Sequence, residues 1–363
     1  MNNRKLVLEN GKVFEGVGFG SSKEVVAEMI YNTSVVGYQE IISDPTNCNK
    51  IICFTYPLIG NYGLTDEDYE SKHICTKGLV VREYNDDPSN FRYTRTLSEV
   101  MEENDIAGIS QIDTRSLMKI IREEGTLKAL ICDIDKPIEE ALEILKNYKE
   151  DEQLVNIVAS KKVWYSRTPN PVCNVAVIDL GTKMNFIKQL NKVGCNVICF
   201  PYNSKIEDIL KYKPDGLFIS NGPGDPTKLE EVVNTIKSFI GKIPMLGVSL
   251  GFELIGLAYG IDIVKMKCGH HGSNYPVKNV ITGKVEITTQ NHLFTLNKEQ
   301  LTNSQLLITH ENVLNKEVEG ICDKENRVIG VQFEPSTPID EDSENIFQEF
   351  LNLMIKCGGN KNA

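Results

Sequence analysis

The C-terminal half of the sequence alternates between continuous apolar runs and segments with helical spacing. The apolar runs are residues 174–181, 196–203, 216–224, 244–251 and 327–335. A strand that is apolar along its whole length is buried on both faces, as in parallel sheets covered by helices. Parallel strands also need crossover connections, which the helical segments between the runs can supply. The alternation therefore predicts a doubly wound α/β domain.

The N-terminal part, up to about residue 130, consists of short β-prone pieces separated by turns. Asn10-Gly11 lies between two such pieces and is a strong hairpin signal. Helices are predicted at 97–104, 113–125 and 137–149, the second with an N-cap at its first residue and a terminal glycine. These features predict a β-rich N-terminal domain.

The boundary between the two parts is marked by a change in composition. The stretch SRTPNPVCN, residues 166–174, contains two prolines and is typical of a linker. We therefore expect an N-terminal domain at 1–150, a linker at 151–172 and the α/β domain at 173–358.

Charge and cysteine usage limit the classes of partner. The net charge of −11 disfavours nucleic acid or an anionic membrane as the main partner. No stretch approaches the roughly 20 apolar residues of a membrane span, and the N-terminus has no signal-peptide pattern. None of the 10 cysteines forms a CxxC pair, and Cys195 with Cys199 is a weak candidate for a metal site. A cytoplasmic protein with reduced thiols is expected.

Three predicted strands end in residues of unusual type. The segment 247–251, GVSLG, has the G-x-S-x-G spacing of a nucleophile elbow, a sharp strand-to-helix turn that exposes a reactive side chain. The segment 220–226, SNGPGDP, has two glycines that allow backbone amides to approach a ligand. The third segment is 331–338, VQFEPSTP. Sites in open α/β sheets form at the carboxyl ends of strands, so these segments are the candidate site.

The motifs of the whole chain resemble those of the small, glutaminase subunit of carbamoyl-phosphate synthetase. In the N-terminal half the resemblance is carried by YNTSVVGYQEIISDPT (31–46) and FTYPLIGNYG (54–63). In the C-terminal half, which resembles a class I glutamine amidotransferase domain, it is carried by ISNGPGDP (219–226), KMKCGHHGSNYPV (265–277) and VQFEP (331–335). The resemblance implies a β-rich small-subunit domain followed by a doubly wound amidotransferase-like domain.

The triad positions of that family are all altered in this chain. The family has a cysteine nucleophile on the elbow, a histidine base at the end of the last strand, and a glutamate two residues later that orients the histidine. Here these positions are Ser249, Glu334 and Ser336. A serine hydroxyl depends on a base far more than a thiol does, and a carboxylate cannot replace an imidazole that relays protons through two nitrogens. The three residues are therefore predicted to be non-functional as a triad. The alternative interpretation is that each is an ordinary turn or strand-end residue with a structural role only.

The resemblance also indicates a glutamine pocket. Its positions here match the family's at Gly222, Gly224, Leu250 and Asn291, and a hydroxyl residue of the N-terminal domain is Thr46. A family glutamine on the elbow helix is replaced by Glu253, whose negative charge is expected to repel the carboxylate of the substrate. The family's Q-N-H-G-F reads Gln290-Asn-His-Leu-Phe294, so Leu293 stands beside Phe294 where a glycine would allow closer approach. A weakened pocket is expected.

The resemblance implies a role in making carbamoyl phosphate, for pyrimidine and arginine biosynthesis. A large synthetase subunit would be the partner, and ATP and Mg²⁺ would act on that subunit, because this chain has no phosphate-binding loop of the G-x-x-x-x-G-K-[ST] type and no expected cofactor. With its own glutaminase predicted to be lost, the complex would use free ammonia. The alternatives are a non-catalytic relative that binds glutamine as a signal or supports other proteins, and a serine hydrolase that uses Ser249 with Glu334.

Overall fold

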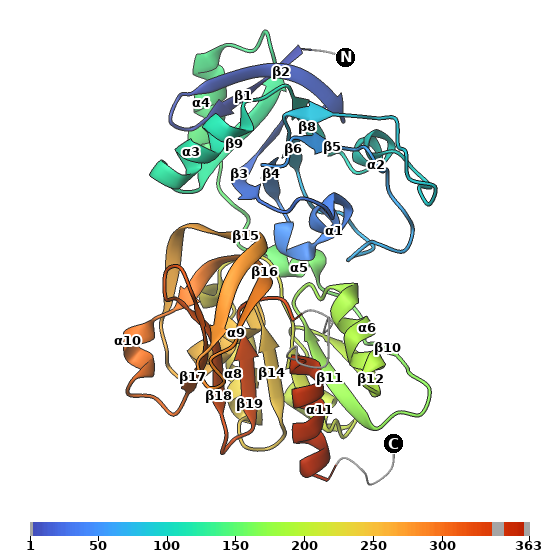
Figure 1. The fold of residues 1–363 in the computed structure, drawn as a ribbon, viewed down its shortest axis with the longest axis vertical. Coiled ribbons are helices and arrows are strands. Elements are labelled where there is room, and N and C mark those ends of the chain that lie inside the picture. The colour runs from blue at the N-terminus through green and yellow to red at the C-terminus, as the bar shows by residue number, and fades with distance from the viewer. Residues whose placement is uncertain (1–2, 336–344, 359–363) are drawn as a thin grey trace. The chain divides into compact units, whose positions relative to one another are not determined.

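The computed structural model describes residues 3–335 and 345–358 (Figure 1). The chain divides into two compact units, the first made of Met1–Asp151 with Lys267–Gly272 and the second of Glu152–Met266 with Ser273–Ala363. The stretch expected to be a linker contains helix α5 (Leu154–Val158) and strand β10 (Trp164–Ser166), both in the second unit. The finer division at 150 and 172 stays a prediction.

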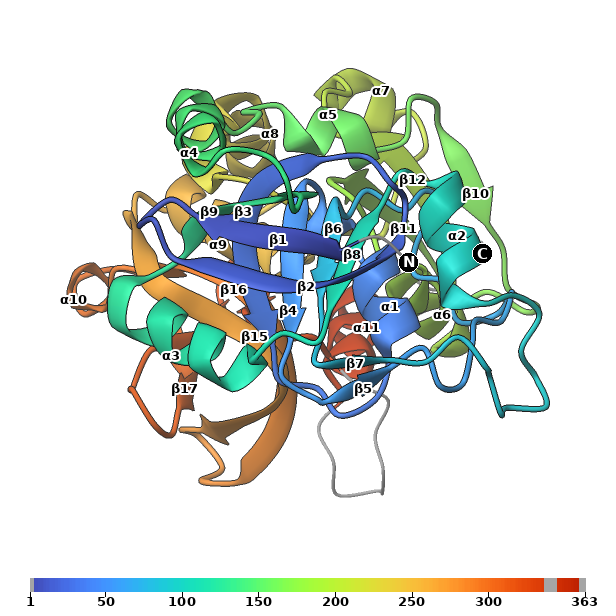
Figure 2. The same cartoon turned by 90° about the horizontal axis from the view of Figure 1, so that it is seen from above.

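The first unit is built around a closed β-barrel, whose labelled strands can be followed in Figure 2. The strand order is β1-β2-β8-β6-β4-β3-β9, and β9 pairs with β1 to close it. The barrel strands are β1 (Asn3–Leu8), β2 (Val13–Gly20), β3 (Val25–Asn32), β4 (Lys50–Phe54), β6 (Gly78–Val80), β8 (Ala107–Ser110) and β9 (Leu127–Asp133). Strands β5 (Leu58–Ile59) and β7 (Glu83–Tyr84) form a separate pair. Closure leaves the barrel without exposed strand edges.

Three helices of the first unit, α2, α3 and α4, lie close to the predicted ranges, whereas α1 and η1 were not predicted. They are α1 (Tyr38–Ser43), the 3₁₀ helix η1 (Pro45–Asn47), α2 (Leu97–Glu103), α3 (Thr114–Glu124) and α4 (Ile138–Asn147). Helix α3 is capped by the Asp113 side chain, which accepts a hydrogen bond from Ser116 N, and it ends at Gly125 with φ 101°. The Asn10-Gly11 turn joins the antiparallel strands β1 and β2, with Gly11 at φ 84°. The predicted hairpin and this helix are confirmed.

The second unit contains one ten-stranded sheet with the order β10-β12-β11-β13-β14-β19-β18-β17-β15-β16. Its remaining strands are β11 (Cys173–Asp179), β12 (Cys195–Pro201), β13 (Gly216–Ile219), β14 (Met245–Val248), β15 (Ile263–Asn279), β16 (Val285–Leu296), β17 (Leu307–Asn312), β18 (Val318–Asp323) and β19 (Val328–Val331). The middle of β15, Lys267–Gly272, is the part of this strand that belongs to the first unit. Its other helices are α6 (Met184–Lys192), α7 (Ile206–Leu210), η2 (Pro226–Lys228), α8 (Glu230–Phe239), α9 (Leu250–Ala258), α10 (Lys298–Leu301) and α11 (Ile346–Lys356).

Five adjacent strands of this sheet, β12-β11-β13-β14-β19, run parallel. Strand β11 shows why their sequences are continuously apolar. Ala176 and Ile178 pack into one core with residues of α8 and α9, whereas Val175 and Val177 pack into another with residues of α6 and α11. The predicted doubly wound arrangement is confirmed, and antiparallel strands at both sides extend it.

Among the described residues, no helix combines the length and the apolar character needed to cross a bilayer.

Candidate active site at the carboxyl ends of the parallel strands

Ser249 occupies the turn between β14 and α9. Its backbone has φ 54° and ψ −113°, a conformation that non-glycine residues rarely adopt, and its N–H donates to Val331 O at 2.9 Å. The flanking glycines are required by close packing, because a Cβ at Gly247 would lie 2.5 Å from Gly251 O and one at Gly251 would lie 2.1 Å from Ile219 O. The G-x-S-x-G spacing therefore forms the strand–turn–helix elbow that it predicts.

A second turn, at the end of β11, positions Lys183. Asp179 Oδ1 accepts hydrogen bonds from the N–H groups of Gly181 and Thr182, at 3.0 Å and 2.9 Å. The turn leads into Lys183, which precedes α6 and whose N–H donates to Asn221 Oδ1 at 3.2 Å. These bonds join the ends of β11 and β13 and bring a lysine to the candidate site.

The Lys183 ammonium forms an ion pair with Glu334, one of the altered triad positions. Lys183 Nζ lies 2.9 Å from Glu334 Oε2, and the two side chains are 8% and 16% exposed. Glu334 follows β19, and its own N–H donates to Thr289 O at 2.9 Å. At the position where the resemblance predicts a base, this chain therefore has a largely buried ion pair.

The hydroxyl of Ser249 has no base bonded to it among the described residues. It forms no cap bond to the start of α9, and no hydrogen bond joins it to Glu334 or to a histidine in this part of the chain. Ser336, the third altered triad position, lies outside the described residues. The arrangement thus lacks the nucleophile–base hydrogen bond that marks an activated serine.

Glu253 is buried on α9, one turn after the elbow. Its side chain accepts a hydrogen bond from Gln332 Nε2 at 3.0 Å, and the residue is 3% exposed. Burial raises the pKa of the Glu253 carboxyl to about 8, aided by the charge of Asp225 and opposed by the Gln332 bond. The repulsion of a substrate carboxylate expected from the sequence requires ionisation, and a group with this pKa is mostly neutral at pH 7. A neutral carboxylic acid has nearly the shape of the glutamine amide that the resemblance predicts at this position.

The backbone positions of the predicted pocket lie at the ends of β13 and β14. Gly222 is buried, and a Cβ there would lie 2.3 Å from Leu180 O, so only glycine fits. Gly224 is exposed with φ 97°. Leu250 is the first residue of α9, and the N–H groups of a helix's first turn have no carbonyl partner within the helix. Such N–H groups can bind a developing oxyanion.

The other predicted pocket residues come from separate elements. Asn291 is buried on β16, where Leu293 and Phe294 are half-buried. Thr46 belongs to the first unit, on the 3₁₀ helix η1, and its N–H donates to Asp44 Oδ1 at 2.9 Å. Their roles in binding glutamine stay predictions.

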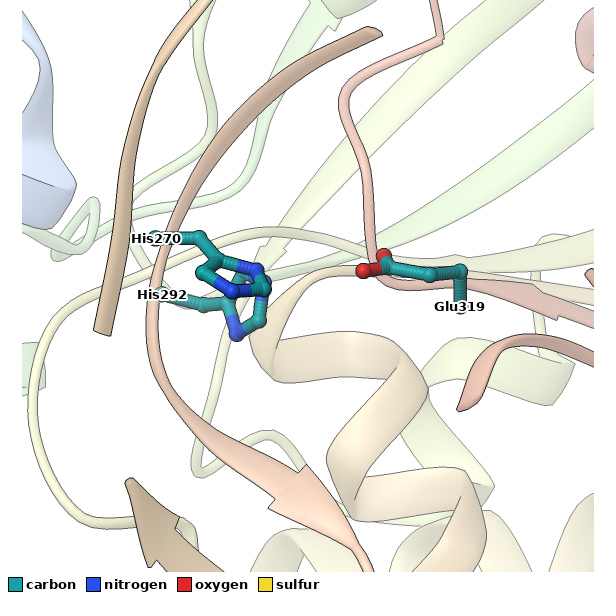
Figure 3. A group of neighbouring side chains, drawn as sticks. All are labelled: His270, His292 and Glu319. Atoms are coloured by element: carbon teal, nitrogen blue, oxygen red, sulfur yellow. The ribbon is translucent and has the colours of Figure 1, made fainter. Parts of the chain in front are cut away.

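A buried polar network in the second unit involves His292, which lies outside the altered triad. Its ring nitrogens lie 2.8 Å from Phe294 O and 3.3 Å from Gln290 Oε1. Gln290 and Asn312 also hydrogen-bond Glu319, and burial, opposed by these bonds, raises the pKa of the Glu319 carboxyl to about 8. Figure 3 shows the side chains of His292 and Glu319. The ring is held by its own neighbours and makes no hydrogen bond to Ser249.

Comparisons with known proteins match two family descriptions to separate parts of the chain. The family described as "Carbamoyl-phosphate synthase small chain, CPSase domain" matches residues 6–131, and "Glutamine amidotransferase class-I" matches residues 176–353. The carbamoyl phosphate synthase small chain of Listeria innocua is 42% identical over 355 residues, which are 98% of this chain and 97% of the relative. The pyrimidine-specific small chain of Halalkalibacterium halodurans is 40% identical over 352 residues, 97% of each chain. The small chain of Bacillus caldolyticus is 42% identical over 352 residues, 97% of this chain and 96% of its own.

The chain belongs to the carbamoyl phosphate synthase small-chain family. The predicted order, a small-chain domain followed by a class I amidotransferase-like domain, is confirmed. Membership in the family does not depend on the triad, since the matches extend over both halves of the chain.

Two residues of the site were not singled out from the sequence. Lys183 lies inside the motif VIDLGTKMNF, and a lysine at the end of a buried strand was the available signal. Gln332 lies in VQFEP between Val331 and Phe333, and this local pattern does not indicate that its side chain bonds to Glu253. Both partners are distant in sequence, so neither contact could be derived from local pattern.

Proposed function

We propose that this chain is a small subunit of carbamoyl phosphate synthase whose own glutaminase site is inactive, so that the complex uses free ammonia. The observation that carries the proposal is the Lys183–Glu334 ion pair at 2.9 Å, which occupies the position of the family's base. A carboxylate held by an ammonium is stabilised in its ionised form and is a poor acceptor for the proton of a serine hydroxyl. No imidazole is bonded to Ser249 in the described part of the chain.

The size of the expected defect follows from the chemistry of triads. In a serine protease, loss of the nucleophile or of the base lowers turnover on the order of 10⁶-fold. Here the histidine base is replaced. The nucleophile is a serine hydroxyl, which is less acidic than the cysteine thiol of the family. Backbone N–H groups at the elbow could still polarise a bound amide, but they supply no proton to the leaving ammonia.

The partner of the proposed complex is the large synthetase subunit, which would carry ATP and Mg²⁺. The names of the relatives support this partner, because each is the small chain of a synthase. The product, carbamoyl phosphate, would serve pyrimidine or arginine biosynthesis.

The decisive experiment is reconstitution with the large synthetase subunit, followed by measurement of carbamoyl phosphate from ammonium chloride or from glutamine. We expect ammonium-dependent synthesis and no glutamine-dependent synthesis above the background of the large subunit alone. Comparable rates with the two nitrogen donors would refute the proposal.

A restored variant provides the matched control. Ser249→Cys, Glu334→His and Ser336→Glu together return a thiol, an imidazole and an orienting carboxylate to the chain. Glutamine hydrolysis by this variant alone would show that only the triad is broken. If this variant is still inactive, the pocket also contributes to the loss of glutamine hydrolysis, in particular Leu293.

A second candidate, binding of glutamine without hydrolysis, is favoured by the protonation of Glu253. A neutral acid at this position removes the charge repulsion at neutral pH, and Gly222, Gly224 and Leu250 keep the backbone of the pocket. Calorimetric titration with glutamine at pH 7 distinguishes a sensor, which binds, from a purely structural subunit, which does not.

A further inference from the structure

Two cysteines of the first unit, Cys48 and Cys75, lie on chain segments that run side by side. Strands β4 and β6 run parallel with Ile51 opposite Gly78. The regular register ends there, because β4 begins at Lys50 and Asn49 has φ 57°. The two segments nevertheless stay side by side, because Lys77 N donates to Lys50 O and Asn49 N to Cys75 O, both at 2.9 Å. Asn49 N belongs to the peptide bond that follows Cys48, so its bond to the Cys75 carbonyl brings the two cysteines next to each other.

The two thiols are in contact but differ in access to solvent. A hydrogen bond joins the side chains of Cys48 and Cys75. Cys48 is fully buried, whereas Cys75 is partly exposed, with Sγ 3.8 Å from His73 O. Of the two thiols, Cys75 is therefore the more accessible to a small solute.

The charges around the pair favour a thiolate on Cys75. The hydrogen bond from Cys48 and the positive charge of Lys77 lower the pKa of the Cys75 thiol to about 7, against the effect of burial. The same hydrogen bond, together with burial, raises the pKa of Cys48. The other nearby charge, Lys50, is held in ion pairs with Glu28 and Glu150. Cys75 is thus the thiol suited to react first with an oxidant, and Cys48 is the thiol suited to react with the oxidised Cys75.

We propose that Cys48 and Cys75 form a peroxide-sensitive dithiol site that closes to a disulfide. The Cys75 thiolate attacks one oxygen of hydrogen peroxide, the O–O bond breaks, and the released hydroxide takes up a proton as water, leaving a sulfenic acid. The Cys48 sulfur then attacks the Cys75 sulfur and expels the hydroxyl group, which leaves as a second water with the Cys48 proton. The peroxide is reduced and the two thiols are oxidised by two electrons.

A second pair of neighbouring cysteines in the same chain serves as an internal control. Cys173 and Cys195 face each other in the register of β11 and β12. Both are fully buried, and burial raises the pKa of their thiols to about 11 and about 12. Cys173 and Cys195 are direct neighbours within paired strands, so a failure of this pair to oxidise shows that adjacency of two cysteines is not sufficient and that access and thiolate character matter.

The test uses the full chain, reduced, freed of reductant and exposed to a small molar excess of hydrogen peroxide at pH 7.4. Remaining thiols are blocked with N-ethylmaleimide before trypsin digestion without reductant. Cleavage after lysine places Cys48 alone in residues 24–50 and Cys75 alone in residues 73–77. We expect these two peptides to be linked, with a mass lower by two hydrogens than their sum, while residues 168–183 and 193–205 remain unlinked and blocked or unreacted.

The reverse result overturns the proposal. Absence of the 24–50/73–77 link at doses that oxidise Cys75 further, or equal linking of the Cys173 and Cys195 peptides, would show that the first pair has no special reactivity. In Cys48→Ala, the sulfenic acid on Cys75 is expected to persist and to react with dimedone. The pH at which Cys75 is half-maximally alkylated by iodoacetamide should also rise in this variant, because the donor to the thiolate is gone; an unchanged pH profile would contradict the proposed role of Cys48.

Discussion

Replacement of Glu253 by glutamine should change how the stability of the second unit depends on pH. The Glu253 carboxyl is buried on α9, accepts a hydrogen bond from Gln332 and has a pKa raised to about 8, mainly by burial. Glutamine has nearly the same shape and still accepts the bond through its carbonyl oxygen, but it cannot ionise. The variant therefore removes one titration and keeps most of the packing.

The sign and size follow from proton linkage. Between pH 4.5, the ordinary pKa of this carboxyl, and about pH 8, the folded state holds a proton that the unfolded state has released. Unfolding in this window releases a proton, so the stability of the wild type falls as pH rises and levels off above pH 8. At about 1.4 kcal/mol for each pH unit, the whole loss attributable to Glu253 is on the order of 5 kcal/mol. Glu253→Gln should not show this share of the loss.

Urea unfolding of both proteins between pH 5 and pH 9 measures the effect. The single tryptophan, Trp164, lies on β10 in the second unit, so its fluorescence reports unfolding of the unit that contains Glu253. Glu231→Gln, on the exposed face of α8, is the matched control and should keep the slope of the wild type. If Glu253→Gln and the wild type lose stability with pH at the same rate, the carboxyl is ionised in the folded protein and the reasoning is wrong.

Three further outcomes are expected. Glu319→Gln, like Glu253→Gln, should make the stability of the second unit fall less between pH 4.5 and about pH 8, because burial also raises the pKa of Glu319 to about 8. The same fluorescence titration measures this. Lys183→Met should lower the stability of the second unit by roughly 1–3 kcal/mol, because it leaves the shielded Glu334 carboxylate without its ammonium, whereas Lys211→Met, at an exposed pair with Asp208, should have no measurable effect in the same urea titration. Ser249→Cys alone should not release ammonia from glutamine in a coupled dehydrogenase assay, because the thiol still lacks an imidazole; turnover by this single variant would mean that another group acts as the base.

The parts of the fold that could be predicted are those in which local chemistry and tertiary structure agree. Asn10-Gly11 specifies its hairpin through backbone conformations that these two residues adopt easily, and Asp113 with Gly125 brackets α3. The parallel strands were recognisable because burial on both faces removes polar residues from them. The elbow was recognisable because close packing leaves no room for a side chain at Gly247 or Gly251.

The antiparallel strands of the second unit were not recognisable in the same way. Strand β15 contains glycines, a proline and several lysines, and it lacks both the apolar run of a buried strand and a regular period of two. Its strand conformation depends on pairing, for example with β17. Such pairing is a long-range property that intrinsic propensity does not determine.

The chemistry of the candidate site depended even more on long-range contacts. Lys183 and Glu334 are 151 residues apart, and only the fold brings them together. The sequence suggested a negative Glu253, whereas the structure raises the pKa of that carboxyl through burial, which a sequence window does not report. The sequence therefore predicts which residue types lie at the motif positions, but it does not predict their protonation states or their hydrogen-bond and ion-pair partners.

The geometry of the elbow and the chemistry of the elbow are separable in this protein. The positive φ of Ser249 and the glycines beside it follow from how β14 turns into α9 against β13, and none of these features requires a reaction. Catalysis requires in addition a group that accepts a proton from the nucleophile and returns it to the leaving ammonia. Glu334, the residue at the predicted base position, forms an ion pair with Lys183. A strained, well-formed elbow is therefore evidence for the amidotransferase-like fold, and the hydrogen bond from nucleophile to base is the feature that distinguishes an active member of the family from a scaffold.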